Sequence, residues 1–176
     1  MNLILRQETS NDFSEVANVV EQAFQHVEIS DQQEHFLVDR LRKSNAFVPE
    51  LSIVAESNTK IVGHILLTKI NIVNNSTSFE SLALAPVSVL PKFQNQGIGG
   101  KLIKESHRIA KELNFKSIVL LGHENYYPKF GYELTNKYNI EIPFDAPEEN
   151  CMVIELVPNG LKGVSGKVEY SSAFFE

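Results

Sequence analysis

The sequence is poor in the residues that staple a small protein or anchor it in a membrane. It has one cysteine, Cys151, so it cannot form an internal disulfide bond. It has no tryptophan. No stretch approaches the roughly 18 apolar residues of a transmembrane helix. The apolar run at residues 3–5 is also too short for a signal peptide. Its 16 basic residues are outnumbered by 22 acidic ones, which gives a net charge of −6. We therefore expect a cytoplasmic protein that binds neither membranes nor, by general charge attraction, nucleic acids.

The rest of the composition is that of a globular protein. The chain has 176 residues, of which 43% are hydrophobic and 22% charged. We expect one domain, residues 1–176, around one core. The five histidines lack the spacing of a metal site, so we expect no metal. Cys151 lies in an apolar run without an adjacent histidine or cation, which predicts an inert buried thiol in a strand rather than an acyl carrier.

The hydrophobic pattern changes between the periods of helices and strands. Helical periods mark residues 13–24, 31–43 and 97–113. Strand patterns mark residues 3–5, 51–56, 61–73, 79–90, 116–121 and 152–157, and we expect Pro49 to lie in a loop. The order strand, glycine turn, helix, strand over residues 79–121 favours a crossover between two parallel strands.

Pro86 lies inside the strand pattern of residues 79–90. Proline has no N–H to donate to a sheet ladder, so this position predicts a β-bulge or an open edge. A strand that stops pairing midway is unusual, and it points to a function for this segment.

A glycine-rich turn, residues 94–100, follows this strand and leads into the third helix. Unpaired backbone N–H groups beside the positive end of a helix dipole favour binding of a phosphate. The turn is not a P-loop, because Asn95 and Leu102 stand where a glycine and a serine or threonine are required. It is not a dinucleotide fingerprint either, because Leu102 also replaces the third glycine.

The turn resembles the pyrophosphate-binding signature of the GNAT superfamily of acyl-CoA-dependent N-acetyltransferases. It reads Gln94-x-x-Gly97-x-Gly99, with Pro91 three residues upstream. A second match is Tyr-Tyr-Pro-Lys-Phe-Gly-Tyr at residues 126–132, which resembles the family's Tyr-x-x-x-Gly-aromatic element, with Tyr127 as its tyrosine. The sequence resembles the YhbS-like bacterial subgroup over nearly the whole chain, through residues 84–94, 121–123, 126–132 and 155–161.

The resemblance implies an α/β fold with a central, mostly antiparallel sheet, a parallel pair splayed at a bulged strand, and helices on both faces. It implies transfer of an acetyl group from the co-substrate acetyl-CoA to a primary amine of a small molecule or protein, by direct attack in a ternary complex. Tyr127 would protonate the leaving thiolate, and backbone groups of the bulged strand would hold the thioester carbonyl or the oxyanion. The residues that it implies for CoA binding are Val87, Val89, Gln94, Asn95, Gln96, Gly97, Ile98, Gly99 and Gly100.

Several points stay open. No carboxylate lies within residues 81–85, so the general base is Glu80 at the start of that strand, His64 on the neighbouring strand, or water. The acceptor amine is not encoded in a recognisable motif, and the protein is a monomer or a homodimer. The alternative function is a non-catalytic domain of the same fold that senses CoA or binds a partner. The presence of Tyr127 favours the enzyme.

Overall fold

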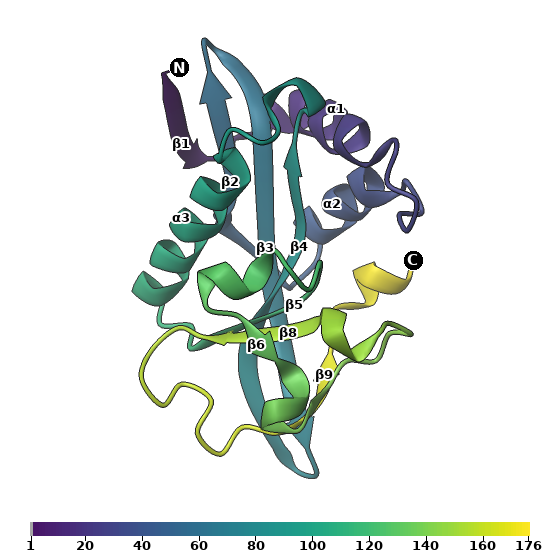
Figure 1. The fold of residues 1–176 in the computed structure, drawn as a ribbon, viewed down its shortest axis with the longest axis vertical. Helices are drawn as coiled ribbons and strands as arrows, with labels where there is room; N and C mark the ends of the chain where they lie inside the picture. Colours follow the sequence, from purple (N-terminus) through teal and green to yellow (C-terminus); the bar gives the residue numbers. More distant parts are fainter. Residues whose placement is uncertain (1) are drawn as a thin grey trace.

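A nine-stranded sheet forms the centre of the computed structural model, which describes residues 2–176 (Figure 1). Three α-helices accompany it: α1 (Phe13–Phe24), α2 (Glu34–Arg42) and α3 (Ile98–Glu112). The strands are β1 (Leu3–Gln7), β2 (Phe47–Ser57), β3 (Lys60–Asn74), β4 (Thr77–Val89), β5 (Ser117–Leu121), β6 (Glu133–Leu134), β7 (Ile140–Glu141), β8 (Cys151–Glu155) and β9 (Gly166–Glu169).

The strand order is β1-β2-β3-β4-β5-β8-β6, and β9 pairs with both β3 and β7. The pair β4–β5 is parallel, as is the short pairing of β7 with β9, while the other pairs are antiparallel. The predicted crossover from β4 through α3 to β5 is therefore confirmed, and so is the predicted mostly antiparallel sheet.

Helices cover both faces of the sheet, with α3 on one face and α1 and α2 on the other (Figure 1). Neighbouring residues of a strand point to opposite faces. Ile65 accordingly packs into the core that α3 covers, and Leu66 into the core beneath α1 and α2. This double cover explains why β3 is almost continuously apolar, because neither of its faces meets water.

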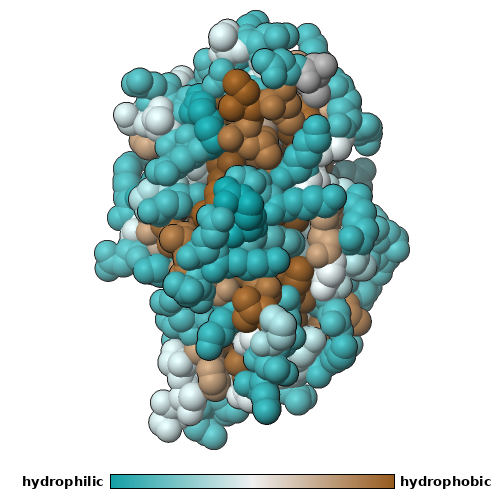
Figure 2. Space-filling view, turned by 90° about the vertical axis from the view of Figure 1, so that its left-hand side faces the viewer, coloured by the Kyte–Doolittle hydropathy of each residue, from teal (hydrophilic) through white to brown (hydrophobic). Residues whose placement is uncertain are grey.

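The outer surface of α3 is polar. Its inward residues, such as Leu102 and Ile103, are fully buried, whereas Lys101, Lys104 and Arg108 are exposed. Figure 2 shows the side of the molecule that carries β1 and α3, where hydrophilic residues form a band below an apolar patch. None of the helices in the described part of the chain has the length and apolar composition needed to cross a membrane.

Two expectations were wrong in detail. Pro49 lies within β2 instead of in a loop, in the stretch where the register with β3 shifts between Phe47 and Ser52. The strand β9 was not expected, because Gly166–Glu169 has only one buried residue, Val168, and too little apolar character to stand out.

Candidate active site

Strands β4 and β5 stay paired for only two residues each. Leu82 pairs with Ile118 and Ala83 with Val119. Just before these pairs, the buried Oγ of Ser81 lies 2.7 Å from Oγ and 3.0 Å from the carbonyl oxygen of Ser117. Beyond Ala83 the two strands separate, so the edge of β4 that faces β5 has no strand partner among residues 2–176. The result is a V-shaped opening in the sheet between β4 and β5.

A bulge lies at the start of this opening. On β3 the register moves from Ile65 to Leu67, while on β4 it moves from Val87 back to Leu84, so β4 holds one extra residue. Pro86 lies inside this step, which confirms the predicted bulge. The N–H of Leu90 donates to Val62 O on β3 (2.9 Å). Since backbone groups of a strand alternate between its two edges, those of Val87 and Val89 face the opening.

The glycine turn lies at the wide end of the V. Gly97 is the N-cap of α3 and has a φ of 79°, a left-handed conformation that favours glycine. Gln94 Nε2 donates to Val89 O (3.0 Å), which joins the turn to the end of β4. A cavity of about 440 Å³ lies here, and its lining consists of Val89, Phe93, Gln94, Asn95, Gly97, Ile98, Gly99, Gly100, Tyr126 and Lys129.

Seven of the nine residues implied for CoA binding therefore line one cavity. Val87 lies outside it, further along the V, and Gln96 points its amide to Lys92 O at 3.1 Å. The lining also includes Tyr126 and Lys129, which the sequence interpretation did not single out.

Tyr126 and Lys129 form one side of this cavity. A Cβ placed on Gly99 would lie 3.1 Å from the Tyr126 hydroxyl, so only a glycine leaves this approach open. Lys129 Nζ lies 3.9 Å from the centroid of the Tyr126 ring, a cation–π contact. The signal that could have revealed the pair is a cation inside the tyrosine motif, two residues before Gly131.

Tyr127 points inward, with 8% of its surface exposed. Its ring packs edge-on against Tyr126 and Tyr132, at centroid distances of 5.1 and 5.7 Å. Gly122, directly after β5, is needed for this placement, because a Cβ there would collide with the Tyr127 ring. Burial raises the pKa of Tyr127 well above its usual value, so the phenol keeps its proton. Within the described residues, no group accepts a hydrogen bond from this hydroxyl.

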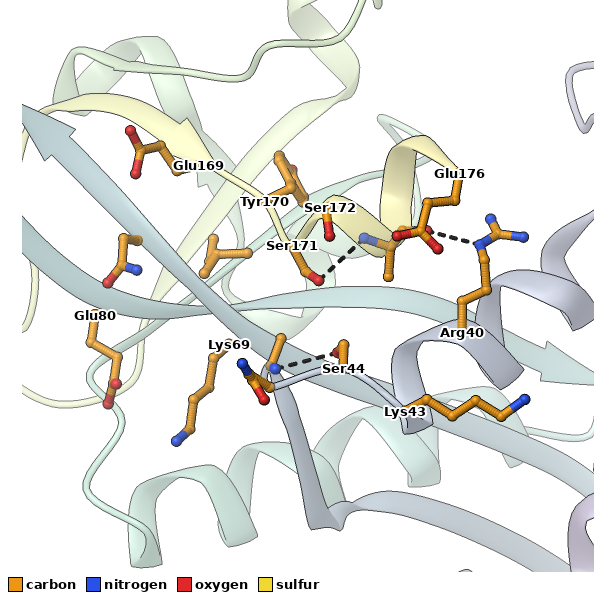
Figure 3. Close-up of a pocket in the computed structure, with 15 residues that line it drawn as sticks. Arg40, Lys43, Ser44, Lys69, Glu80, Glu169, Tyr170, Ser171, Ser172 and Glu176 are labelled. Atoms are coloured by element: carbon orange, nitrogen blue, oxygen red, sulfur yellow. Dashed lines mark hydrogen bonds between the residues drawn. The ribbon is translucent and has the colours of Figure 1, made fainter.

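The two candidate bases lie in different places. Glu80 is exposed and lies opposite Asn71, on β4 before the strands separate. It belongs to another cavity, of about 660 Å³, where its side chain and that of Lys69 extend the same way from the sheet (Figure 3). His64 is fully buried and lies opposite Ser88, between the two residues whose backbone groups face the V. Of the two, only His64 lies opposite the part of β4 that borders the opening, although β4 separates it from the opening itself.

Cys151 is the first residue of β8 and is buried, as expected. Burial raises the pKa of its thiol, and the nearby Glu148 and Glu149 raise it further. The thiol form is therefore favoured over the nucleophilic thiolate.

Comparison with known proteins agrees with this geometry. Residues 5–135 match a family model described as an acetyltransferase (GNAT) domain. Among curated proteins of Escherichia coli K12, the uncharacterized N-acetyltransferase YjhQ is 31% identical over 141 residues, which cover 80% of this chain and 75% of YjhQ. The uncharacterized N-acetyltransferase YhbS is 25% identical over 138 residues, covering 78% of this chain and 81% of YhbS.

Two solved structures are similar along almost their whole length. A GNAT acetyltransferase from Brucella melitensis, in complex with acetyl-CoA, has a TM-score of 0.81 and 32% identity, covering 98% of each chain. YhbS from E. coli, in complex with CoA, has a TM-score of 0.90 and 23% identity, covering 100% of this chain and 93% of that one.

Proposed function

Since the chain belongs to the GNAT family of N-acetyltransferases, we propose that it moves the acetyl group of acetyl-CoA directly onto a primary amine within a ternary complex. One observation carries this proposal: the free edge of β4 and the N-terminus of α3 open onto the same V. The acetyl-CoA complex of the Brucella relative supports the same donor.

The pyrophosphate of CoA fits the cavity at the glycine turn. The first N–H groups of a helix have no partner within the helix, and the helix dipole adds positive potential there. The Lys129 ammonium lies on the rim of the same cavity and supplies a full positive charge. An anion thus meets donors and positive potential, although the protein as a whole carries a net charge of −6.

The pantetheine arm would run along the free edge of β4. Its amide groups would pair with the backbone of Val87 and Val89 as another strand does. At the bulge, a backbone N–H would hold the thioester oxygen, where negative charge develops during attack. Recognition by backbone groups explains why residues 84–89 need no charged side chain.

Tyr127 would then protonate the leaving thiolate. A general acid must hold its proton until the transition state, and the raised pKa of the buried phenol meets that requirement. The free hydroxyl would donate to the sulfur as the C–S bond breaks. Cys151 takes no part in this route, because its thiol is buried and its pKa raised.

Two measurements test the proposal. Acetyl-CoA should raise the melting temperature of the protein, by mass action on the native state. Release of free CoA thiol should then be followed with a panel of polyamines, aminoglycosides, amino acids and peptides. Turnover with an amine and kinetics of a ternary complex are expected. Binding without turnover of any amine would instead support a CoA-sensing domain, and absence of binding would refute both functions.

A further inference from the structure

Residues 126–130 lie across the first turn of α3. A Cβ on Gly99 would lie 3.1 Å from the Tyr126 hydroxyl oxygen, and a Cβ on Gly100 would lie 3.3 Å from the Phe130 ring. Both distances are shorter than an ordinary van der Waals contact, so the two glycines allow this segment to approach the helix closely. The approach brings the Tyr126 hydroxyl to the end of α3 whose first backbone N–H groups have no partner within the helix.

The two adjacent tyrosines approach different elements. Tyr126 lies over Gly99 on α3, whereas Tyr127 lies over Gly122, directly after β5. Their rings meet edge-on, with the centroids 5.1 Å apart. Tyr126 is half-buried and lines the cavity at the glycine turn, and Tyr127 does not belong to that lining. The two hydroxyls can therefore contact different parts of one bound molecule.

The Tyr126 hydroxyl is an unused hydrogen-bond donor. The ring packs against Tyr127 and Phe130, and none of residues 2–176 forms a hydrogen bond with its oxygen. Partial burial raises the pKa of Tyr126, so the phenol keeps its proton near pH 7. A protonated phenol donates to any acceptor oxygen within reach, and the oxygens of a phosphate only accept at this pH.

Lys129 is the one charged residue in the lining of this cavity, as far as the chain is described. Its Nζ lies 3.9 Å from the centroid of the Tyr126 ring and 5.2 Å from that of Phe130. Lys43 and Lys137 form ion pairs with carboxylates, whereas Lys129 has no such pair within residues 2–176. Aromatic rings hold an ammonium in position without neutralising it, so the cavity keeps a positive charge.

We propose that the Tyr126 hydroxyl donates a hydrogen bond to the diphosphate of acetyl-CoA, and that the Lys129 ammonium neutralises part of the charge of the same diphosphate. The backbone N–H groups at the start of α3 bind it from the other side. The adjacent tyrosines thus have separate roles, Tyr126 at the diphosphate and Tyr127 at the sulfur. This inference rests on the proposed acetyl transfer, and it assigns one part of the donor to each side chain.

The two side chains add selectivity that backbone groups lack. Unpaired N–H groups at a helix N-terminus bind phosphates of many kinds. The attraction of the Lys129 ammonium grows with the charge of the ligand, so it favours a diphosphate over a single phosphodiester. The hydroxyl adds a hydrogen bond at a fixed place, because the contact with Gly99 holds the Tyr126 ring. A thioester that lacks the diphosphate gains from neither group.

Binding of CoA to the whole protein, measured by calorimetry without any amine, tests the two side chains. Tyr126→Phe keeps the ring contacts and should fold. A hydrogen bond to a charged group contributes roughly ten- to a hundredfold in affinity, so the dissociation constant should rise by that factor. Lys129→Met should raise it by about tenfold at low salt, and this loss should shrink as the salt concentration rises.

Lys104→Met is the matched control for charge. It also removes one exposed lysine, but Lys104 lies on the outer surface of α3 and outside the cavity. Its dissociation constant for CoA should change by less than about twofold, because solvent and salt screen a charge at that distance. Melting temperatures without ligand confirm that all three variants are folded.

Dephospho-CoA then locates the contact, because it keeps the diphosphate and lacks the 3′-phosphate of CoA. The losses caused by Tyr126→Phe and Lys129→Met should be the same for both ligands. Losses that disappear with dephospho-CoA would place the pair at the 3′-phosphate and overturn the inference. Unchanged affinity for CoA in the two folded variants would also overturn it, with the acetyl transfer left intact. Failure of the unmodified protein to bind CoA would refute the proposed function itself.

Discussion

Removing one oxygen atom, in Tyr127→Phe, separates a general acid from a tyrosine that only fills space. The ring would keep its contacts with Tyr126 and Tyr132, since these involve carbon atoms of the ring. A hydrogen bond contributes about 0.5–1.5 kcal/mol to stability, and none is lost here. We therefore expect a change in the free energy of unfolding below about 0.5 kcal/mol and an unchanged affinity for CoA.

The expected effect on catalysis is much larger. Positioned proton transfer typically contributes a factor of about a hundred or more. A thiolate is already a fair leaving group, so we expect kcat to fall by roughly ten- to a thousand-fold. At about 1.4 kcal/mol for each factor of ten, this is about 1.4–4 kcal/mol in activation free energy. Tyr127→Phe should thus change the activation free energy several times more than it changes the free energy of unfolding.

Tyr132→Phe serves as the control, because it should give the opposite result. The Tyr132 hydroxyl lies 2.9 Å from His107 Nε2, and both residues are buried. Its removal leaves the imidazole nitrogen unpaired, which costs about 1–3 kcal/mol in stability. Turnover should remain close to that of the unmodified protein, since this hydroxyl is engaged with His107 on α3.

The assay for both variants is release of CoA thiol at saturating amine, together with urea unfolding at the same pH. A loss confined to KM would mean that the Tyr127 hydroxyl binds the ground state and the transition state equally. If folded Tyr127→Phe keeps its kcat at a pH where chemistry limits the rate, Tyr127 has no role as the acid.

The remaining predictions concern the glycine turn, the thiol and the buried histidines. Gly99→Val should abolish the rise in melting temperature with acetyl-CoA, because its side chain enters the cavity beneath Tyr126; normal binding by the folded variant would place the pyrophosphate elsewhere. Cys151→Ala should keep most of the activity, and trapping of an acetylated Cys151 during turnover would contradict direct transfer. Burial lowers the pKa of His64 and of His107 to about 4. The unfolded chain therefore binds their protons first as the pH falls below about 6.5. The free energy of unfolding should consequently fall between about pH 6.5 and 4, by at most about 2.7 kcal/mol per pH unit for the two groups together. Urea unfolding at pH 7 and pH 5 measures this loss, and equal stabilities would refute the burial of neutral histidines.

Features that depend on local sequence were predictable. A proline in the middle of a strand predicts a bulge by the loss of one N–H, and the bulge is found at Pro86. A glycine turn before an amphipathic helix predicts an anion site, and six of residues 94–100 line one cavity. In both cases the physical cause lies within a few neighbouring residues.

Features that depend on distant segments were not predictable. A buried hydrogen-bond network joins Arg42 to Glu8, Glu8 to Ser52 and Ser52 to His64, and these four residues lie on four different segments. No spacing along the chain reveals such a set. Tyr126 and Lys129 reach the glycine turn only because their segment folds back over the N-terminus of α3. Glu80 was a candidate from the sequence, and only the register of β4 shows that it lies before the strands separate.

The unpaired edge of β4 also has an evolutionary consequence. Every residue type except proline carries the same N–H, so most substitutions at residues 84–89 leave the donors and acceptors of this edge in place. The edge along which we propose that the acyl donor lies is therefore tolerant of mutation, provided that the bulge persists. The loops and helices on the other side of the fold, in contrast, would recognise an acceptor through particular side chains, which single substitutions can change. Selection can thus alter the acceptor while the donor stays the same, and one frame can acquire new substrates by small steps.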